Sequence, residues 1–144
     1  MFRKFLLLKA VPIAPNFGLL LLRIVIFLSL FLKHGTEKLL GFGTMSLHFP
    51  DPLHIGAFPS FLFAMISDGI CTLLIVVGLA TRWAAVLLFV NVFVAWAFIH
   101  NFLFFGRGSD HGELIVLYLG AAITLFFTGA GRFSIDALLD KQGR

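Results

Sequence analysis

The sequence predicts an all-α protein, a four-helix transmembrane bundle with its N-terminus and C-terminus in the cytoplasm. Hydrophobic residues make up 60% of the 144 residues and charged residues only 12%, whereas a soluble domain is about one quarter charged. Apolar runs long enough to cross a bilayer occur four times along the chain. Lysine and arginine are also distributed unequally between the two ends of these runs, as the positive-inside rule describes.

The four apolar runs cover residues 16–40, 58–79, 83–104 and 112–128. Each has a length within the range of roughly 17 to 25 residues that a helix needs to cross the hydrocarbon core. The first linker is long and carries Pro50 and Pro52, and the second is a tight turn that ends at Arg82. The third linker contains Gly106 and Gly108, which also indicate a break between helices.

The distribution of basic residues predicts the orientation. Seven lie on the side that holds the termini and the second linker: Arg3, Lys4, Lys9, Arg82, Arg132, Lys141 and Arg144. Three lie on the opposite side: Lys33, Lys38 and Arg107. This excess places both termini in the cytoplasm. The net charge of +4 therefore reflects topology, and we do not expect nucleic acid as a partner, because the basic residues flank apolar runs.

The chain divides into three parts. Residues 1–15 form an interfacial N-terminal segment, residues 16–131 the four-span membrane domain, and residues 132–144 a cytoplasmic tail. In the tail, Ser134 is a candidate N-cap and is followed by Ile135, Leu138 and Leu139 at helical spacing. This pattern predicts a short amphipathic C-terminal helix at the membrane interface.

Arg23 and Asp68 lie inside apolar runs, where a charge costs roughly 2.5–3.5 kcal/mol and must be paired or hydrated. At about 1.5 Å of rise per residue, both lie near the middle of the bilayer. We therefore expect adjacent antiparallel helices to pair them. Two interpretations stay open: an ion pair that only fixes helix packing, or a polar site for a headgroup or cofactor.

Four polar residues fall at the outer ends of three spans: His34, Lys38, His100 and Glu113. They are the candidate catalytic residues, because histidine and glutamate exchange protons near neutral pH and lysine stabilises an anion. A quinone headgroup suits such a pocket, since its carbonyls need donors and its reduction consumes protons. The alternative is that each residue only satisfies a helix end or interfacial water.

Other polar residues in the spans carry weaker signals. The five histidines lack ligand spacing, so no metal site is expected. Cys71 is expected to be an inert buried thiol. Asn91 lies half a turn from His100 by helical phase and is expected to hydrogen-bond across a different helix contact. No haem or phosphate-loop motif is present, so no intrinsic cofactor is expected.

From about Leu19 to Leu139 the sequence resembles the DoxX family of small four-helix membrane proteins. The most specific pieces are the Arg23…Gly35…Lys38 spacing, Gly78 followed by Thr81-Arg82, and Gly131-Arg132-Phe133-Ser134-x-Asp136. The chain departs from the family pattern in its second span. Asp68 stands where a glutamate is usual, and Cys71 and Thr72 stand where paired glycines are usual.

The resemblance implies a multi-pass protein of a prokaryotic cytoplasmic (inner) membrane. Some members are subunits linked to quinone reduction, as in thiosulfate:quinone oxidoreductase, and others occur in membrane-associated oxidoreductase complexes. We therefore predict a subunit of a redox system that offers an outward-facing pocket to a quinone or small redox substrate. Partner redox subunits or a bound cofactor would supply the electrons.

Whether the chain is an enzyme stays open. The alternative function is a non-enzymatic membrane scaffold or accessory subunit of a larger complex. A homo-oligomer that forms a pore is a third possibility, although no inverted repeat points to a transporter.

Overall fold

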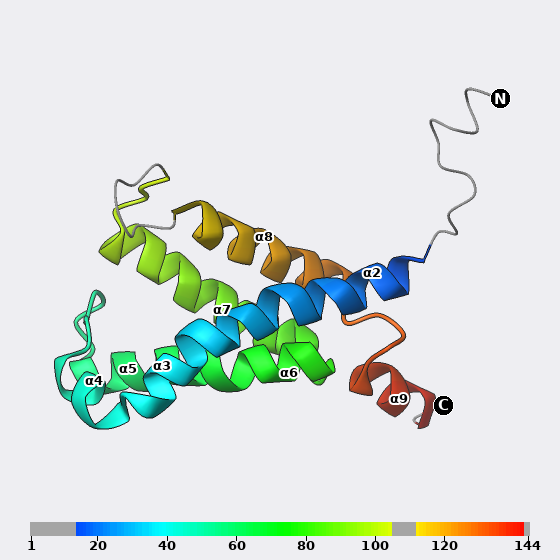
Figure 1. Cartoon of the computed structure of the whole chain (residues 1–144), viewed down its shortest axis with the longest axis horizontal. Helices are drawn as coiled ribbons and strands as arrows, with labels where there is room; N and C mark the ends of the chain where they lie inside the picture. Colours follow the sequence, from blue (N-terminus) through cyan, green and yellow to red (C-terminus); the bar gives the residue numbers. More distant parts are fainter. Residues whose placement is uncertain (1–13, 105–111, 143–144) are drawn as a thin grey trace.

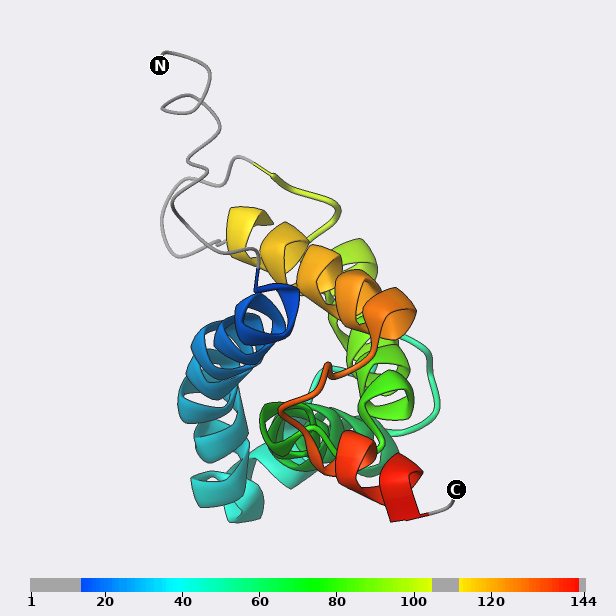
Figure 2. The ribbon, with the colours of Figure 1, turned by 90° about the vertical axis from the view of Figure 1, so that its right-hand side faces the viewer.

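The computed structural model describes residues 14–104 and 112–142, which are mostly helical and contain no strand. Four long helical rods lie side by side and alternate in direction, and the view along the bundle shows them arranged around a common core (Figures 1 and 2). This arrangement confirms the predicted helical bundle. The predicted interfacial segment at residues 1–15 lies almost entirely outside the described residues, as does the third linker at 105–111.

The first rod combines α2 (Pro15–Leu22), η1 (Arg23–Leu28), η2 (Phe31–Gly35) and α3 (Thr36–Leu40). The second combines α5 (Ala57–Met65), η3 (Ile66–Cys71) and α6 (Thr72–Val77). The third combines α7 (Thr81–Val94) and η4 (Ala95–Ile99), and the fourth is α8 (Gly112–Thr128). Among the described helices, the first three rods are long and apolar enough to cross a membrane, and α8 is a shorter apolar helix of 17 residues.

The helices differ from the sequence prediction in two places. The third rod ends at Ile99 rather than residue 104, because Asn101 and Phe102 adopt left-handed backbone angles that a helix cannot continue. The long first linker also contains a helix that was not predicted, α4 (Phe42–His48). The second rod ends at Gly78, whose φ of 75° closes the helix, with the Leu79 N–H bonded to the Leu74 carbonyl.

The core lies between the rods and combines large and small apolar residues. Phe27, Leu30, Ile75, Leu88 and Leu125 are fully or almost fully buried. Four alanines of α7 and α8 join them: Ala84, Ala85, Ala121 and Ala122. Such small residues let two transmembrane helices approach closely, and many large apolar side chains on the outside remain exposed, as a lipid-facing surface requires.

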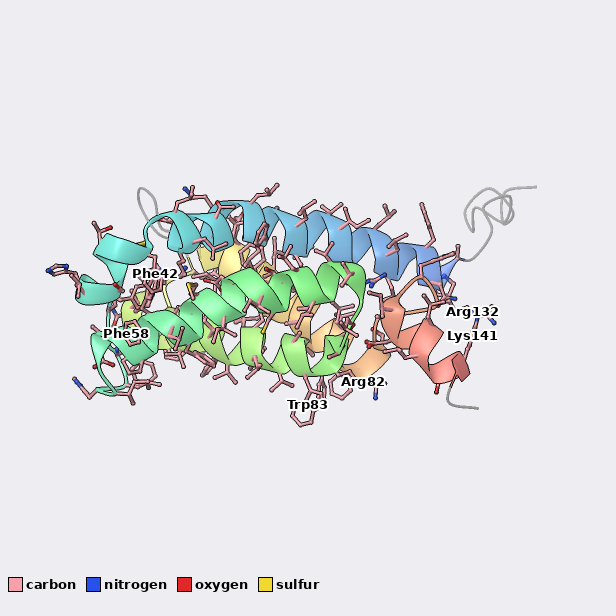
Figure 3. All side chains as sticks on the ribbon, turned by 90° about the horizontal axis from the view of Figure 1, so that it is seen from below. Phe42, Phe58, Arg82, Trp83, Arg132 and Lys141 are labelled. Atoms are coloured by element: carbon pink, nitrogen blue, oxygen red, sulfur yellow. The ribbon has the colours of Figure 1, made fainter. Side chains whose placement is uncertain are left out.

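The two ends of the bundle differ. The distal end consists of α3, α4, residues 49–56 and the turn after η4; the terminal end consists of the start of α2, the Gly78–Arg82 turn, the end of α8 and α9 (Ile135–Gln142). Figure 3 shows Phe42 and Phe58 at the distal end, and Arg82, Trp83, Arg132 and Lys141 at the terminal end. The predicted C-terminal helix is confirmed as α9, and the Ser134 hydroxyl accepts the Ala137 N–H at 3.2 Å, as an N-cap does.

Gly35 brings the first and second rods into backbone contact. A Cβ atom on Gly35 would lie only 2.6 Å from the Asp68 carbonyl oxygen, which is closer than real Cβ contacts. The missing side chain therefore sets the separation of the two rods at this level. Lys38 follows Gly35 by about one helical turn and so faces the same part of η3.

We expect Gly35→Ala to destabilise the bundle by about 1–3 kcal/mol, because the added methyl overpacks a backbone contact. Cys71 is the single cysteine and is 2% exposed, so its reaction with a fluorogenic maleimide during heating in detergent reports unfolding. Gly18→Ala is the matched control in the same rod, since its Cβ would meet nothing within 4 Å. Equal unfolding temperatures for the two variants would contradict the close-contact role of Gly35.

Candidate functional site

A cavity of about 690 Å³ opens among the rods toward the distal end. Its volume falls in the range of roughly 300–1,000 Å³ that small-molecule sites occupy. Its wall is mainly apolar and includes Leu30, Phe63, Ala64, Val90, Ile115 and Tyr118. The cavity is covered by α4 and residues 49–56, which contribute Met45, His48, Phe49 and Leu53 to the lining. We call these two segments the distal cover.

Three polar side chains from three rods meet at one side of this cavity. The Lys38 ammonium lies 2.8 Å from Oδ2 of Asp68, and the Asn91 side-chain amide donates to Oδ1 of Asp68 at 2.9 Å. Lys38 and Asp68 are only 8% and 6% exposed. We call Lys38, Asp68 and Asn91 the polar triad. It gives both carboxylate oxygens a partner, which a charge at this depth requires.

The surroundings hold the triad in place. The Lys38 ammonium lies 6.0 Å from the centre of the Phe49 ring, at the limit of a cation–π contact. Phe49 packs edge-on against the fully buried Phe61, with ring centroids 5.4 Å apart. The Thr72 hydroxyl donates to the Asp68 backbone carbonyl at 2.6 Å. The distal cover and the second rod therefore both restrain the ion pair.

His34 and His100 also line the cavity, so the structure brings four of the predicted site residues together: His34, Lys38, Asp68 and His100. Nδ1 of His34 lies 4.0 Å from the Glu37 carboxylate, and both side chains are about half exposed. His34 and Asp68 each lie in a π-helical segment, η2 and η3. Such segments are uncommon and occur often at functional sites.

Glu113 is not among the residues that line the cavity, so the expected convergence does not include it. It is exposed on the first turn of α8. At about 100° per residue, Glu113 points about 160° away from Ile115 and about 140° away from Tyr118. These two residues form the cavity-facing side of α8.

Arg23 does not pair with Asp68, which corrects the predicted mid-membrane brace. Its guanidinium is fully buried and donates to the carbonyl oxygens of Ile75, at 3.5 Å, and Phe133. Ile75 follows Asp68 by seven residues, so Arg23 lies roughly 10 Å closer to the terminal end than the carboxylate. Arg23 does not line the distal cavity and instead fastens the C-terminal segment to the bundle.

Asp136 completes this fastening. Its carboxylate accepts the backbone N–H groups of Ala80, at 2.7 Å, and Thr81, at 3.0 Å, and so caps the start of α7. The Asp136 N–H in turn donates to the Gly78 carbonyl at 2.8 Å. The segments around Gly78 and Asp136, far apart in sequence, therefore form one contact, which we call the terminal clasp.

Sequence reasoning did not identify the triad, although one signal was available. Asn91 is a lone carboxamide in an otherwise apolar stretch of the third rod. The expectation that it hydrogen-bonds across a helix contact is confirmed by its bond to Asp68. Helical phase suggested that Asn91 and His100 face different contacts, yet both line the cavity. Residues 95–99 are π-helical, and this wider turn shifts the phase between them.

Within residues 14–104 and 112–142, no three His, Cys, Asp or Glu side chains come close enough to hold a metal ion. Cys71 lies in the apolar core beside Ile75 and Leu30, as expected for a packing thiol.

The family model named DoxX matches residues 18–101. The chain belongs to the DoxX family. An uncharacterized protein of Haemophilus influenzae is 31% identical over 137 residues, with 92% of this chain and 90% of the relative covered. A second uncharacterized protein of the same organism is 33% identical over 129 residues, covering 84% and 90%. No solved structure is a significant match. The matched region contains all three triad residues.

The distal cover is held by one carboxylate outside the spans. The Asp51 carboxylate accepts hydrogen bonds from the Ile55 N–H at 3.0 Å, the Gly56 N–H at 2.7 Å and the Ser60 hydroxyl at 2.8 Å. Desolvation alone would raise the pKa of Asp51, but these hydrogen bonds outweigh it and hold the pKa below the ordinary value of 3.8. Asp51 therefore ties the cover to the start of α5.

We expect the Asp51 contact to be lost only in acid. Because the folded pKa is lowered, the carboxylate contributes its full stabilisation above pH 3.8 and loses it as the pH falls through the folded pKa. Hydrogen exchange at the Ile55 and Gly56 amides, corrected for intrinsic rates, should accelerate below about pH 4. In Asp51→Asn both amides should exchange faster at neutral pH, and their corrected exchange rates should not increase further below about pH 4. If the variant still showed the same acceleration of exchange in acid, a group other than Asp51 would be responsible for it.

We expect Lys38→Met to destabilise the bundle strongly, because it leaves Asp68 buried without its partner, a change that costs roughly 3–5 kcal/mol in buried pairs. Lys33→Met is the matched control, since Lys33 is an exposed lysine of the same rod. The double variant Lys38→Met/Asp68→Leu should recover part of the loss. Thermal labelling of Cys71 measures all three, and equal effects of the two single variants would argue against a stabilising pair.

Proposed function

We propose that the distal cavity binds a quinone or a similarly neutral small redox substrate, and that the protein serves as a membrane subunit of a redox system. The observation that carries this proposal is the polar triad at the side of an otherwise apolar cavity. An amphiphile with a small polar head and an apolar body matches that distribution of surfaces.

The charge balance of the triad favours a neutral headgroup. Lys38 and Asp68 cancel one another, so the cavity offers no net charge there to an anion such as a phosphate. The Lys38 ammonium uses one of its three donors on Asp68 and retains capacity for a ligand carbonyl. The Asn91 carbonyl oxygen can accept a hydrogen bond from a ligand hydroxyl. A quinone supplies the acceptors and a quinol supplies the donors that these groups match.

The two histidines supply proton exchange in this proposal. His34 and His100 line the same cavity as the triad, and imidazole takes up and releases protons near neutral pH. Quinone reduction needs two electrons and two protons, so the histidines would carry protons between solvent and the bound headgroup. The electrons would come from a partner subunit or a bound cofactor. We assign the protein to a prokaryotic cytoplasmic membrane with both termini inside, on the basis of its basic residues and its family.

A second candidate, a non-enzymatic scaffold or accessory subunit, is favoured by the terminal clasp. Arg23 and Asp136 are polar residues whose hydrogen bonds fasten chain segments together. On this alternative, Arg23→Leu reduces assembly of the larger complex, while variants of the cavity leave the activity of that complex unchanged.

Quinone binding by the purified protein in nanodiscs tests the proposal. We expect His100→Ala to weaken binding of a ubiquinone analogue by about 0.5–1.5 kcal/mol, because a hydrogen-bond partner of the headgroup is lost. Glu113→Gln is the control, since Glu113 does not line the cavity. Thermal labelling of Cys71 checks that each variant is folded. Equal affinity in the wild type and in folded His100→Ala and His34→Ala proteins would refute the assignment of the cavity.

A further inference from the structure

In a soluble domain an amphipathic helix packs its apolar face against the core, but α9 turns its apolar face away from the bundle. Asp136, Ala137 and Asp140 line a depression against the turn before α7 and the end of α8. On the opposite face, Ile135, Leu138 and Leu139 are 37%, 59% and 53% exposed. The carboxylate-bearing face therefore docks on the bundle, and the leucine face points away from it.

This orientation is fixed by contacts at the start of the helix. The Asp136 carboxylate bonds the Ala80 and Thr81 N–H groups, and the Asp136 N–H bonds the Gly78 carbonyl. One residue before Ser134, the Phe133 carbonyl accepts from the buried Arg23 guanidinium. Because these bonds hold α9 in register, its apolar face stays outward and needs an apolar environment from elsewhere.

The charges around α9 indicate which environment this is. Figure 3 shows Arg82, Arg132 and Lys141 at the terminal end, with Trp83 beside Arg82. All four side chains are exposed, and Trp83 is 76% exposed, as tryptophan commonly is at the level of lipid headgroups. Basic side chains beside an apolar helix face are the pattern of helices that bind anionic membrane surfaces.

We propose that the terminal end is a binding surface for anionic phospholipids. In this arrangement α9 lies in the headgroup layer, with Leu138 and Leu139 at the acyl boundary. Arg82, Arg132 and Lys141 contact lipid phosphates. With eight residues, α9 is about 12 Å long and far too short to cross the bilayer, so it lies along the surface.

The lipid surface also acts on the bundle, because α9 is joined to it through the terminal clasp. Anionic lipid that holds α9 in place favours the conformation in which Asp136 caps α7 and Phe133 meets Arg23. The Cys71 thiol can then become exposed to solvent only after these contacts break or after the lipid dissociates from α9. An anionic leaflet should therefore slow exposure of Cys71, although no lipid touches this thiol directly.

The first experiment measures Cys71 labelling in nanodiscs of phosphatidylcholine alone and of an equimolar mixture with phosphatidylglycerol. We expect the anionic lipid to slow labelling of the wild type by about tenfold, since each basic group near an anionic surface contributes several-fold. The triple variant Arg82→Gln/Arg132→Gln/Lys141→Gln should lose the effect. Lys33→Gln, which removes an exposed lysine near the other end of the bundle, should retain it.

Two outcomes of this experiment overturn the proposal. One is an equal response to phosphatidylglycerol in the wild type and the triple variant. The other is an equal slowing by inorganic phosphate in phosphatidylcholine nanodiscs, which would indicate a site for free phosphate rather than a lipid surface.

The second experiment places the leucine face directly. A spin label at Leu138→Cys, in a Cys71→Ser background, should collide more with oxygen than with a water-soluble nickel reagent in the mixed nanodiscs. Dominant nickel collisions would show that this face lies in water. Protection from both reagents would show that a protein or a second copy covers it, and either result would overturn the proposal.

Discussion

The structure depends on one buried ion pair, between Lys38 and Asp68. A separated charge of either sign would be costly at this depth, but at 2.8 Å the two groups neutralise one another, and Asn91 satisfies the second carboxylate oxygen. The pair requires the first and second rods to be close, and Gly35 makes this possible, because its Cα hydrogen meets the Asp68 carbonyl where a methyl would not fit. Three rods are thus held in register by one set of polar contacts.

The same contacts answer a question raised by the sequence of the second rod. Asp68 is shorter than the glutamate that the resemblance led us to expect there, and Cys71 and Thr72 stand where we expected paired glycines. In the structure, the long Lys38 side chain spans the distance to the shorter acid. Thr72 turns its hydroxyl back onto the Asp68 and Gly69 carbonyls, and Cys71 fills part of the core. Close approach is supplied by Gly35 of the facing rod.

The sequence was sufficient for the bundle, because spanning length and linker composition are local properties of a chain. It also singled out Lys38, Asp68, His34 and His100, which line one cavity in the structure, since polar residues in apolar helices are conspicuous. It was wrong about the partner of Arg23. Opposite charges suggested Asp68, but the guanidinium found backbone carbonyls of Ile75 and Phe133, and any residue type can provide a carbonyl. Such a partner leaves no mark in the sequence.

The contacts at the two ends of the bundle differ in how far apart in sequence the joined residues lie. At the terminal end, the Arg23 and Asp136 side chains bond backbone groups that are 52 to 110 residues away in sequence. At the distal end, the cover is held by the Asp51 side chain and by ring contacts of Phe49. The Asp51 bonds reach only four to nine residues along the chain, so their loss would not separate two rods. Phe49 of the cover also lies 6.0 Å from the Lys38 ammonium, so a ligand that displaced the cover would act directly on the ion pair beneath it.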